Sequence, residues 1–579
     1  MAIRQDLGNR LYEAETLLDI SPSCDGLAST TRQTKPAGST WTSFSRMDST
    51  AGIGGSDKQL VADVSDGATV PRVTDLAPVQ LASTETAKPS GLPQRQPIAW
   101  LSVSSAILVV GAVLAATASG YGYHRDELYF LMLKPAWGYV DQPPLTPLLA
   151  RAAVNLFGAH PGTLRIPAVV CVAVAILLSA LIARELGGGR LAQAFAAWGY
   201  AVTTGALITG HVLSTATVDL VLWPAVLLCV TRAQLHTRKW WLAAGVLVGL
   251  SFYNKLLIIL MLIGLGVSLL IVGPRRVLRS PWLWGGVVLA LAIGAPNLIY
   301  QATHDFPQLK MAQALSSGQG DDRVLMLPAQ ILLIGVPLFW LSVRGFQGLW
   351  QRPQWRPVKF IALAYVVALV LSLASAGQVY YPFGLLVYLL AAGSVVVAER
   401  RPGRTGVRWL ATAVTVNGVV AAFLALPLLS VTAFGATPIG AINPTQPDQV
   451  GWPTYVRTVA DWYNRLPAAD QANTVLVTGN YGEAGALVFY GKQYGLPPVY
   501  SGHNQLYYYG PPPYDRTIAL IWTEGTLDEL STNFRNCQQL TTMDNGVGVD
   551  NEEQGSILAL CRDPHAGWAA LWPLIQHYD

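Results

Sequence analysis

The stretch that decides the fold is residues 164–184, LRIPAVVCVAVAILLSALIAR, in which Arg165 and Arg184 are the only charged residues. A helix needs about 20 predominantly apolar residues to cross a bilayer, and a backbone in lipid must satisfy its own hydrogen bonds, which favours helices. Similar stretches recur along the chain, and the predicted spans are 97–119, 164–184, 191–210, 213–231, 240–254, 256–273, 282–300, 327–343, 358–375, 379–398 and 407–430. The sequence therefore predicts a polytopic α-helical membrane protein with about 11 transmembrane helices.

The composition of the 579 residues divides the chain into three parts. It is 52% hydrophobic and only 12% charged, whereas soluble domains carry roughly 25% charged residues. The deficit lies in residues 97–430, the predicted transmembrane domain, with 9 acidic and 23 basic side chains. Residues 1–96, rich in Ser, Thr, Asp, Gly and Pro, are predicted to be a disordered cytoplasmic arm. A soluble enzyme, a secreted disulfide scaffold and a nucleic-acid-binding domain are excluded.

The basic residues between the spans predict the orientation. One set of loops carries sixteen Lys and Arg against two acidic residues, and the opposite set carries seven against six. Basic loops face the cytoplasm. With eleven spans, the N-terminus is then cytoplasmic and residues 431–579 are extracytoplasmic, in a multi-pass protein of the bacterial cytoplasmic membrane.

Residues 431–579 are predicted to form an α/β domain. Strand-like runs are 474–478, 517–523 and 556–561, and a helix-like run is 482–494. Cys537 and Cys561 can pair if this domain is extracytoplasmic. The aromatic loop 507–514 can stack on sugars or pack on the membrane domain, and the sequence leaves both readings open.

The first outer loop, 120–163, carries the most unusual chemistry. It contains YGYHRDELY at 121–129 and GYVDQPPLT at 138–146. Asp126 and Glu127 follow Arg125 at the end of a membrane helix, and a carboxylate beside a cation can stay ionised and act as a general base. A pair of this kind in a solvated loop with ordinary charges is the competing reading. The aromatic content favours short helices in the membrane interface.

Ionisable residues inside or at the ends of apolar helices are the second signal. Asp219 falls about one turn below the outer surface, and Lys255 lies near the outer end of its short span. Buried charge in a bilayer is costly and usually serves a pathway or a site. A structural ion pair between helices is the alternative. Two further clusters, 296–307 with His304 and 377–382 with Gln378, Tyr380 and Tyr381, lie at outer helix ends.

Taken in order, these motifs resemble a known family. Asp-Glu-Leu-Tyr, Gly-Tyr-Val-Asp-Gln-Pro-Pro-Leu, Ser-Thr-x-x-x-Asp, Asn-Lys, Pro-Asn-Leu-Ile-Tyr-Gln with His-Asp-Phe-Pro, and Tyr-Tyr-Pro are similar to bacterial glycosyltransferase family 39. This group includes proteins similar to dolichyl-phosphate-mannose protein mannosyltransferases and lipid A aminoarabinose transferases, and has the GT-C fold. The resemblance covers about residues 97–562. The family position aligned with Gln378 is more often Lys, so the resemblance carries no phosphate-binding role to Gln378.

The resemblance implies a transferase that moves a sugar, mannose as the first choice, from a polyprenyl-phosphate donor to an acceptor hydroxyl outside the membrane, with inversion at the anomeric carbon. Asp126 would be the base, and Glu127 would orient it or bind the acceptor. Asp219 would hold sugar hydroxyls or a cation. Arg125, Lys255 and His304 would bind the donor phosphate, while the substrate-binding residues would be Tyr129, Asp141, Gln142, Gln378, Tyr380 and Tyr381.

Other features of the function are left open by the sequence. No cofactor is certain, and a divalent metal is left open because no metal-ligand spacing occurs. The expected partners are the lipid-linked sugar, the bilayer and a protein, lipid or polysaccharide acceptor, with no nucleic acid. A transporter or flippase of a lipid-linked saccharide is the main alternative, and a non-catalytic receptor is a third.

Overall fold

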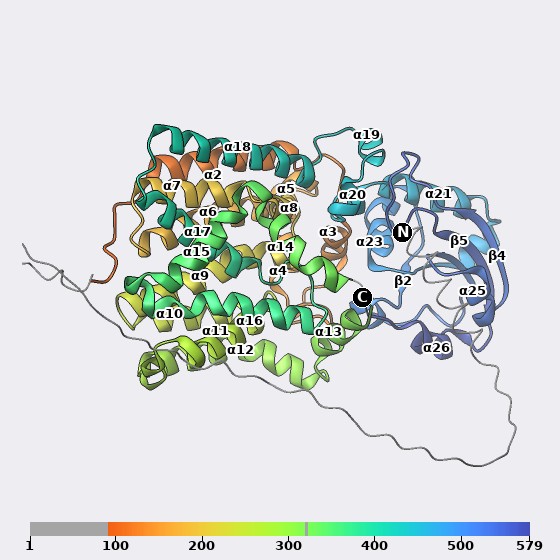
Figure 1. Ribbon diagram of the computed structural model, residues 1–579. Coiled ribbons are helices and arrows are strands. Elements are labelled where there is room, and N and C mark those ends of the chain that lie inside the picture. Colours follow the sequence, from red (N-terminus) through yellow and green to blue (C-terminus); the bar gives the residue numbers. More distant parts are fainter. Residues whose placement is uncertain (1–90, 319–321, 579) are drawn as a thin grey trace, which may run out of the picture. The chain divides into compact units, whose positions relative to one another are not determined.

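A computed structural model describes residues 91–318 and 322–578 of the chain (Figure 1). Residues 91–430 are almost entirely helical, and the five strands all lie beyond residue 473. Nearly all of the predicted N-terminal arm, 1–96, lies outside the described residues, so its disorder stays a prediction.

Apolar helices occupy every predicted span. Five are long and apolar enough to cross a membrane: α2 (Trp100–Thr117), α6 (Ile166–Glu185) with the turn α5 (Pro161–Leu164) before it, α9 (Thr215–Leu235), α12 (Pro281–Thr303) and α18 (Arg404–Ala425). Two bent pairs are α7 (Arg190–Ala201) with α8 (Thr204–His211), and α14 (Met326–Ile334) with α15 (Val336–Gln351). Shorter apolar helices at predicted spans are α10 (Trp240–Ser251), α11 (Ile258–Val272), α16 (Phe360–Ala374) and α17 (Phe383–Glu399). Within the described residues, length and composition support five spans, or up to seven if each bent pair is one span, so the number eleven stays a prediction.

The predicted span at 327–343 is a bent pair of helices. The chain breaks at Gly335, which has φ +95°, and the axes of α14 and α15 differ by 99°. The predicted span at 191–210 is also bent, by 54°. Buried Asn417 of α18 donates hydrogen bonds to Ile334 O (3.0 Å) and Val202 O (2.8 Å), one carbonyl at each break. One side chain thus satisfies backbone groups that a broken helix would otherwise leave unpaired in lipid.

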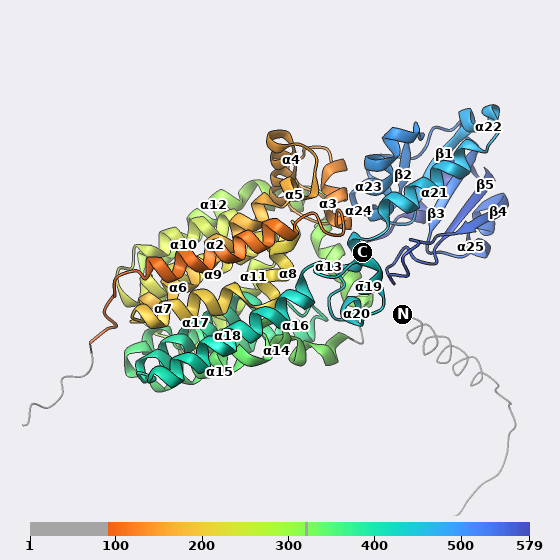
Figure 2. The same cartoon turned by 90° about the horizontal axis from the view of Figure 1, so that it is seen from above.

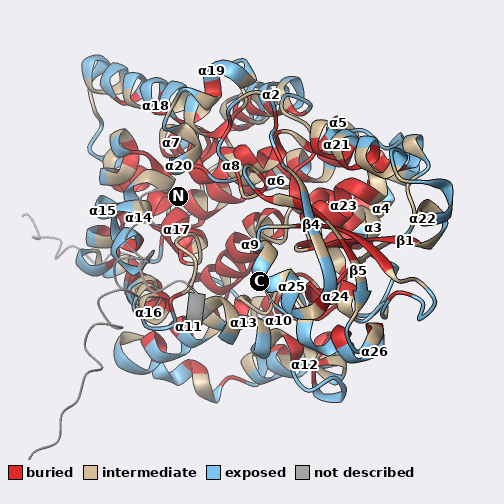
Figure 3. Ribbon diagram, turned by 90° about the vertical axis from the view of Figure 1, so that its right-hand side faces the viewer, coloured by how far each residue is buried: buried red, intermediate tan, exposed pale blue. Residues whose placement is uncertain are grey.

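Burial separates central from peripheral helices (Figure 3). The apolar window of α9 is 78% buried, whereas those of α2, α12 and α18 are 22% buried. Glycines let the central helices approach closely, as in other membrane helix pairs. A Cβ on Gly345 of α15 would overlap the carbonyl oxygen of Leu389 in α17, and one on Gly393 of α17 would overlap that of Leu341 in α15.

The first outer loop contains short helices, as predicted: α3 (Arg125–Met132), α4 (Leu145–Phe157) and α5. Further along, η1 (Arg275–Arg279) and η3 (Pro353–Val358) precede α12 and α16, while α13 (Pro307–Gly318) and η2 (Asp322–Leu325) lie between α12 and α14. A His124 capping box starts α3, because its side chain accepts a hydrogen bond from Asp126 N–H and Glu127 accepts one from His124 N–H.

The C-terminal part is a mixed sheet covered by helices (Figure 2). The strands are β1 (Thr474–Thr478), β2 (Val499–Ser501), β3 (Ile518–Thr523), β4 (Phe534–Thr542) and β5 (Ile557–Pro564), in the order β2-β1-β3-β5-β4. β1 runs parallel to β2 and β3, and β5 is antiparallel to β3 and β4. The other elements are α19 (Val431–Gly435), α20 (Ile439–Ile442), η4 (Pro447–Gln449), α21 (Trp452–Asn464), α22 (Ala468–Asn473), α23 (Tyr481–Tyr490), η5 (Gly491–Tyr494), α24 (Asn504–Tyr507), α25 (Leu527–Asn533), α26 (Gly567–Leu571) and η6 (Trp572–Ile575). The α/β character predicted for this part is confirmed.

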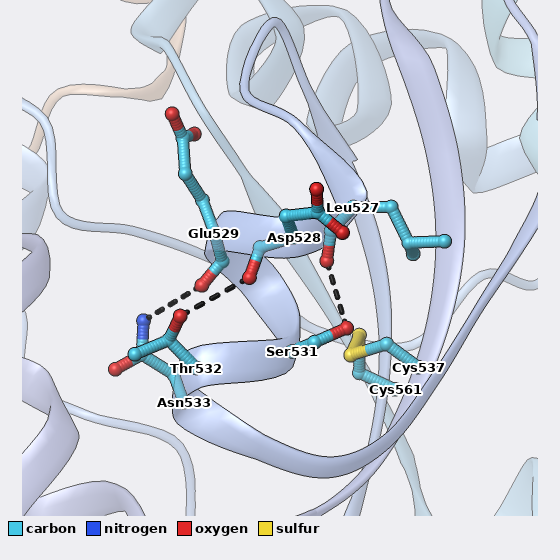
Figure 4. Close-up of a disulfide and its surroundings, with 8 residues drawn as sticks. All are labelled: Leu527, Asp528, Glu529, Ser531, Thr532, Asn533, Cys537 and Cys561. Carbon is cyan, nitrogen blue, oxygen red and sulfur yellow. Dashed lines mark hydrogen bonds between the residues drawn. A yellow bond between two sulfur atoms is a disulfide. The ribbon is translucent and has the colours of Figure 1, made fainter.

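A disulfide joins the last two strands of the sheet. Cys537 of β4 and Cys561 of β5 are opposite each other in the ladder and are bonded, beside α25 (Figure 4). The pairing that the sequence left open is therefore present, and it fixes the edge strand β4 to its neighbour.

Candidate active site

Two neighbouring carboxylates of α3 have opposite surroundings. Glu127 is fully buried and forms a bidentate pair with Arg165, whose Nε and Nη2 lie 2.8 Å from Oε1 and Oε2. Leu213 N–H and His124 N–H also donate to these oxygens. These contacts fix Glu127 inside the protein, where it caps α3, and the prediction that it binds the acceptor does not fit this burial. Its orienting role stays a prediction.

Asp126 is the open member of the pair. Its side chain is 31% exposed, and Oδ1 accepts a hydrogen bond of 2.9 Å from Tyr481 Oη, at the start of α23 in the C-terminal part. Among the described residues, no hydrogen-bond donor to Oδ2 is found. One oxygen is therefore held while the other faces accessible space, which is the arrangement a general base requires.

Arg125 is occupied by residues of the C-terminal part. Its guanidinium is buried, pairs with Glu552 and lies 4.8 Å from the centre of the Tyr481 ring. The prediction that Arg125 binds the donor phosphate does not fit this placement, because its charge is already used to hold the C-terminal part against α3.

Tyr129 and Asp141, both predicted to bind substrate, lie beside Asp126. Tyr129 Oη donates to Asp141 Oδ1 (3.0 Å), and the Tyr129 ring lies 4.8 Å from that of Tyr481. We call Asp126, Tyr129, Asp141 and Tyr481 the outer cluster. Gln142 is buried next to it, and its carbonyl accepts a hydrogen bond from Tyr139 N–H.

Burial dominates the electrostatics around the outer cluster. It raises the pKa of Asp141 to about 7, although hydrogen bonds to the carboxylate oppose the shift. It also raises the pKa of Asp448 to about 6 and that of Glu553 to about 8, against the nearby positive charge of Arg125. Burial thus lets all three carboxyls keep their protons to a higher pH than ordinary carboxyls do.

A second group of residues meets at the ends of membrane helices. Lys255, between α10 and α11, donates to Tyr380 Oη (3.0 Å) and lies 5.3 Å from the ring centres of both Tyr380 and Tyr381. Asp219 Oδ1 accepts a hydrogen bond from Asn254 Nδ2 (2.9 Å), and Oδ2 has no partner within the described part of the chain. We call Asp219, Asn254, Lys255, Tyr380 and Tyr381 the helix-end cluster. Four of these five residues were predicted from sequence.

The first outer loop also contacts the helix-end cluster. Thr146 Oγ1 donates to Asn254 Oδ1 (2.8 Å), and Leu145 N–H donates to Tyr253 O (2.8 Å). Asn254 therefore links the loop to Asp219. The two clusters are reached by one continuous stretch of the loop, from α3 to the start of α4.

Two predicted residues lie apart from these contacts. His304 is exposed at the end of α12, stacks on Tyr300 with 4.1 Å between ring centres, and contacts Tyr300 O through Nδ1 (2.9 Å). The structure does not place it with Lys255, so its predicted phosphate contact finds no support. Gln378 is half-buried in the turn before α17, where its carbonyl accepts a hydrogen bond from Tyr381 N–H (3.1 Å).

No metal-binding arrangement is found within residues 91–318 and 322–578, since no group of three or more His, Cys, Asp or Glu side chains is placed to hold an ion. The divalent metal left open by the sequence therefore has no donor set here, and we derive no step through one.

Sequence reasoning missed three residues that shape these clusters. Tyr481 lies 355 positions from Asp126, and no local pattern signals that contact. Asn254 adjoins Lys255 and was visible as an amide in an apolar helix end. Arg165, at the start of an apolar run, gave no sign that it would pair with Glu127.

Comparisons with known proteins agree with this architecture. Residues 141–300 match the family model of dolichyl-phosphate-mannose-protein mannosyltransferase, a segment that includes Asp141, Asp219 and Lys255 but begins after Asp126. No curated protein sequence matches the chain.

Solved structures extend the likeness. ArnT from Cupriavidus metallidurans bound to undecaprenyl phosphate is 16% identical, with a TM-score of 0.51, over 79% of this chain and 97% of that one. ArnT in the apo state has 14% identity and a TM-score of 0.52 over the same shares. Arabinofuranosyltransferase AftD from Mycobacteria is 13% identical, with a TM-score of 0.48, over 82% of this chain and 40% of that one. The predicted resemblance is confirmed: the chain is a membrane protein with the GT-C fold, similar to glycosyltransferase family 39.

Proposed function

We propose that the protein is a glycosyltransferase that moves a sugar from a polyprenyl-phosphate donor to an acceptor hydroxyl, with Asp126 as the general base. The observation that carries the proposal is the partly exposed Asp126 carboxylate, which has one oxygen held by Tyr481 and one open. This carboxylate lies in the first outer loop, close to where an acceptor arriving from water would meet a lipid donor.

The helix-end cluster suits the donor. A lipid-linked substrate stays in the bilayer, so its phosphate needs a cation near the membrane surface, and Lys255 supplies one. The undecaprenyl phosphate bound in one ArnT structure supports a lipid phosphate as the ligand. Asp219 Oδ2 is buried and lacks a partner among the described residues, and we propose that a sugar hydroxyl of the bound donor supplies one. Mannose is the first choice by similarity to the matched family.

The proposed reaction is a single displacement at the anomeric carbon. The acceptor oxygen forms a bond to this carbon while the bond between the carbon and the phosphate oxygen breaks. The electron pair of the broken bond stays on the phosphate oxygen. The acceptor proton passes to Asp126. Lys255 stabilises the negative charge that develops on the leaving polyprenyl phosphate. Attack opposite the phosphate inverts the anomeric centre.

The proposed topology places residues 120–163 and 431–579 outside the bacterial cytoplasmic membrane and the N-terminus inside, with residues 97–430 as the transmembrane domain. The disulfide between Cys537 and Cys561 supports the extracytoplasmic placement of residues 431–579, because structural disulfides persist in oxidising compartments. The acceptor is a protein, lipid or polysaccharide hydroxyl.

A transporter of lipid-linked saccharides is the second candidate, and the two bent helix pairs favour it, because transporters build sites from broken helices. At these breaks, however, Asn417 takes up the carbonyls of Ile334 and Val202. Those groups are not free to coordinate a substrate, so the transferase is preferred.

The test uses purified protein in lipid vesicles with labelled polyprenyl-phosphate sugars and a membrane or wall extract. We expect wild type to move label from lipid to acceptor and Asp126→Asn to lose about 10²–10⁴-fold in rate, the usual contribution of a general base. Asp305→Asn, the same change at an exposed outer position, is the control and should keep wild-type rates.

Equal rates in wild type and Asp126→Asn would refute the assigned base. Absence of transfer from every donor, combined with movement of the intact lipid across the vesicle, would establish the transporter.

A further inference from the structure

The contact between α3 and α23 joins the membrane part to the C-terminal part at the base itself. Glycines make this contact close: a Cβ on Gly485 would lie 2.9 Å from Leu128 C and Cβ, and one on Gly482 would lie 3.0 Å from Arg125 Cβ. Contacts of 3.0 Å or less leave no room for a larger side chain without a shift of one helix. The start of α23 is therefore held at a fixed distance from Asp126.

Tyr481, the first residue of α23, is itself held on several sides. Its ring lies 4.8 Å from the guanidinium of Arg125, 4.8 Å from Tyr129 and 4.9 Å from His503, measured to ring centres. Its N–H donates to His503 Nδ1 (3.1 Å). The Oη can then reach Asp126 Oδ1 at 2.9 Å without loss of side-chain freedom at the time of reaction.

A capping box also stabilises the N-terminus of α23, where Tyr481 lies. Asn480 and Glu483 form a capping box, in which Glu483 N–H donates to Asn480 Oδ1 (2.9 Å) and Asn480 N–H donates to Glu483 Oε2 (3.1 Å). Burial and the charge of Asp126 raise the pKa of Tyr481 well above its ordinary value, so its hydroxyl keeps the proton that it donates.

We infer that Tyr481 is a positioning residue for the transfer reaction: the C-terminal part, through this hydroxyl, fixes one carboxylate oxygen of Asp126 so that the other faces the acceptor. This inference rests on the proposed function. It makes the C-terminal part a component of the catalytic apparatus.

The test compares Tyr481→Phe with Tyr490→Phe, because both lose one hydroxyl from the same helix and no hydrogen bond to Tyr490 Oη is found among described residues. Hydrogen bonds to charged groups are strong enough that we expect kcat of Tyr481→Phe to fall about 10- to 100-fold. The KM for the lipid donor should stay unchanged, since Lys255 and Asp219 are untouched. Tyr490→Phe should keep wild-type kinetics.

A second readout separates positioning from folding. A carboxylate that loses a hydrogen-bond donor is protonated more readily, so the acid limb of the pH–rate profile should move to higher pH in Tyr481→Phe. Thermal unfolding should show that both Phe variants are folded at the assay temperature. Wild-type kcat and an unmoved profile in Tyr481→Phe would overturn the inference, as would equal losses in both variants.

The outcomes also separate this inference from the function on which it rests. An inactive Asp126→Asn with a fully active Tyr481→Phe would refute the positioning role alone. An active Asp126→Asn would refute the base, and with it the role of Tyr481.

Discussion

The outer cluster and the helix-end cluster hold a carboxylate in the same way but differ in what surrounds it. Asp126 and Asp219 each accept one hydrogen bond of 2.9 Å on Oδ1, from Tyr481 and Asn254 respectively. The helix-end cluster adds the ammonium group of Lys255, between membrane helices, whereas the outer cluster joins two parts of the chain and has a partly exposed carboxylate, Asp126. The difference suggests a division of work, with the acceptor proton handled in the outer cluster and the phosphate charge in the helix-end cluster.

Removing the cation tests this division most strongly. Lys255→Met keeps the length and apolar stem but deletes the charge that would face the donor phosphate, and loss of such a stabilising group costs about 10²–10³-fold in kcat. Single-turnover transfer from the lipid donor measures the effect. Lys134→Met, at an exposed lysine over the Tyr509 ring, is the matched control and should transfer normally. Equal rates for Lys255→Met and wild type would refute the assignment of the phosphate charge to the helix-end cluster.

The two adjacent carboxylates of α3 allow the same comparison of surroundings within the first outer loop. Glu127→Gln leaves Arg165 as a buried charge without its full partner, and breaking a buried pair costs about 3–5 kcal/mol of folding free energy. Thermal unfolding in detergent should therefore show a lower midpoint for Glu127→Gln. Asp126→Asn, one position earlier and partly exposed, should unfold like wild type. If both variants were equally stable, the structural role of Glu127 would be wrong.

The smallest effect is expected on the pH dependence of the free energy of unfolding. Asp141 in the folded protein keeps its proton up to about 7, because burial raises its pKa from the ordinary 3.8. Its contribution to stability is fully present below pH 4 and is lost as the pH rises through 7. Asp141→Asn has no proton to lose, so its stability should decline less over this interval, by about 2 kcal/mol after allowance for solvent screening. Parallel unfolding curves of wild type and variant from pH 4 to 7.5 would contradict the burial of this carboxyl.

The sequence singled out residues whose charge is unusual for their surroundings. Asp219 and Lys255 stand out in apolar helices, and the structure brings both into one cluster. The helix positions were predicted because long apolar runs are visible in the sequence. The break at Gly335 was not, since a glycine in an apolar run also fits a continuous membrane helix.

The division between Asp126 and Glu127 was beyond sequence reasoning for a geometric reason. Successive residues of a helix point about 100° apart, so one carboxylate can face water and the next the core, and neither identity nor spacing says which. The Asp126–Tyr481 contact was hidden for another reason, because it depends on how two parts of the chain pack across 355 positions.

The glycines of α23 have a consequence for modular exchange. Gly482 and Gly485 let α23 pack directly on Arg125 and Leu128 of α3, so the C-terminal part supplies the glycines that this close contact requires. A chimera made by grafting a foreign C-terminal part at residue 431 would lose these contacts, unless the graft also supplied glycines at these two positions and a tyrosine before them. An exchanged C-terminal part must therefore match the surface of α3 as well as fold by itself.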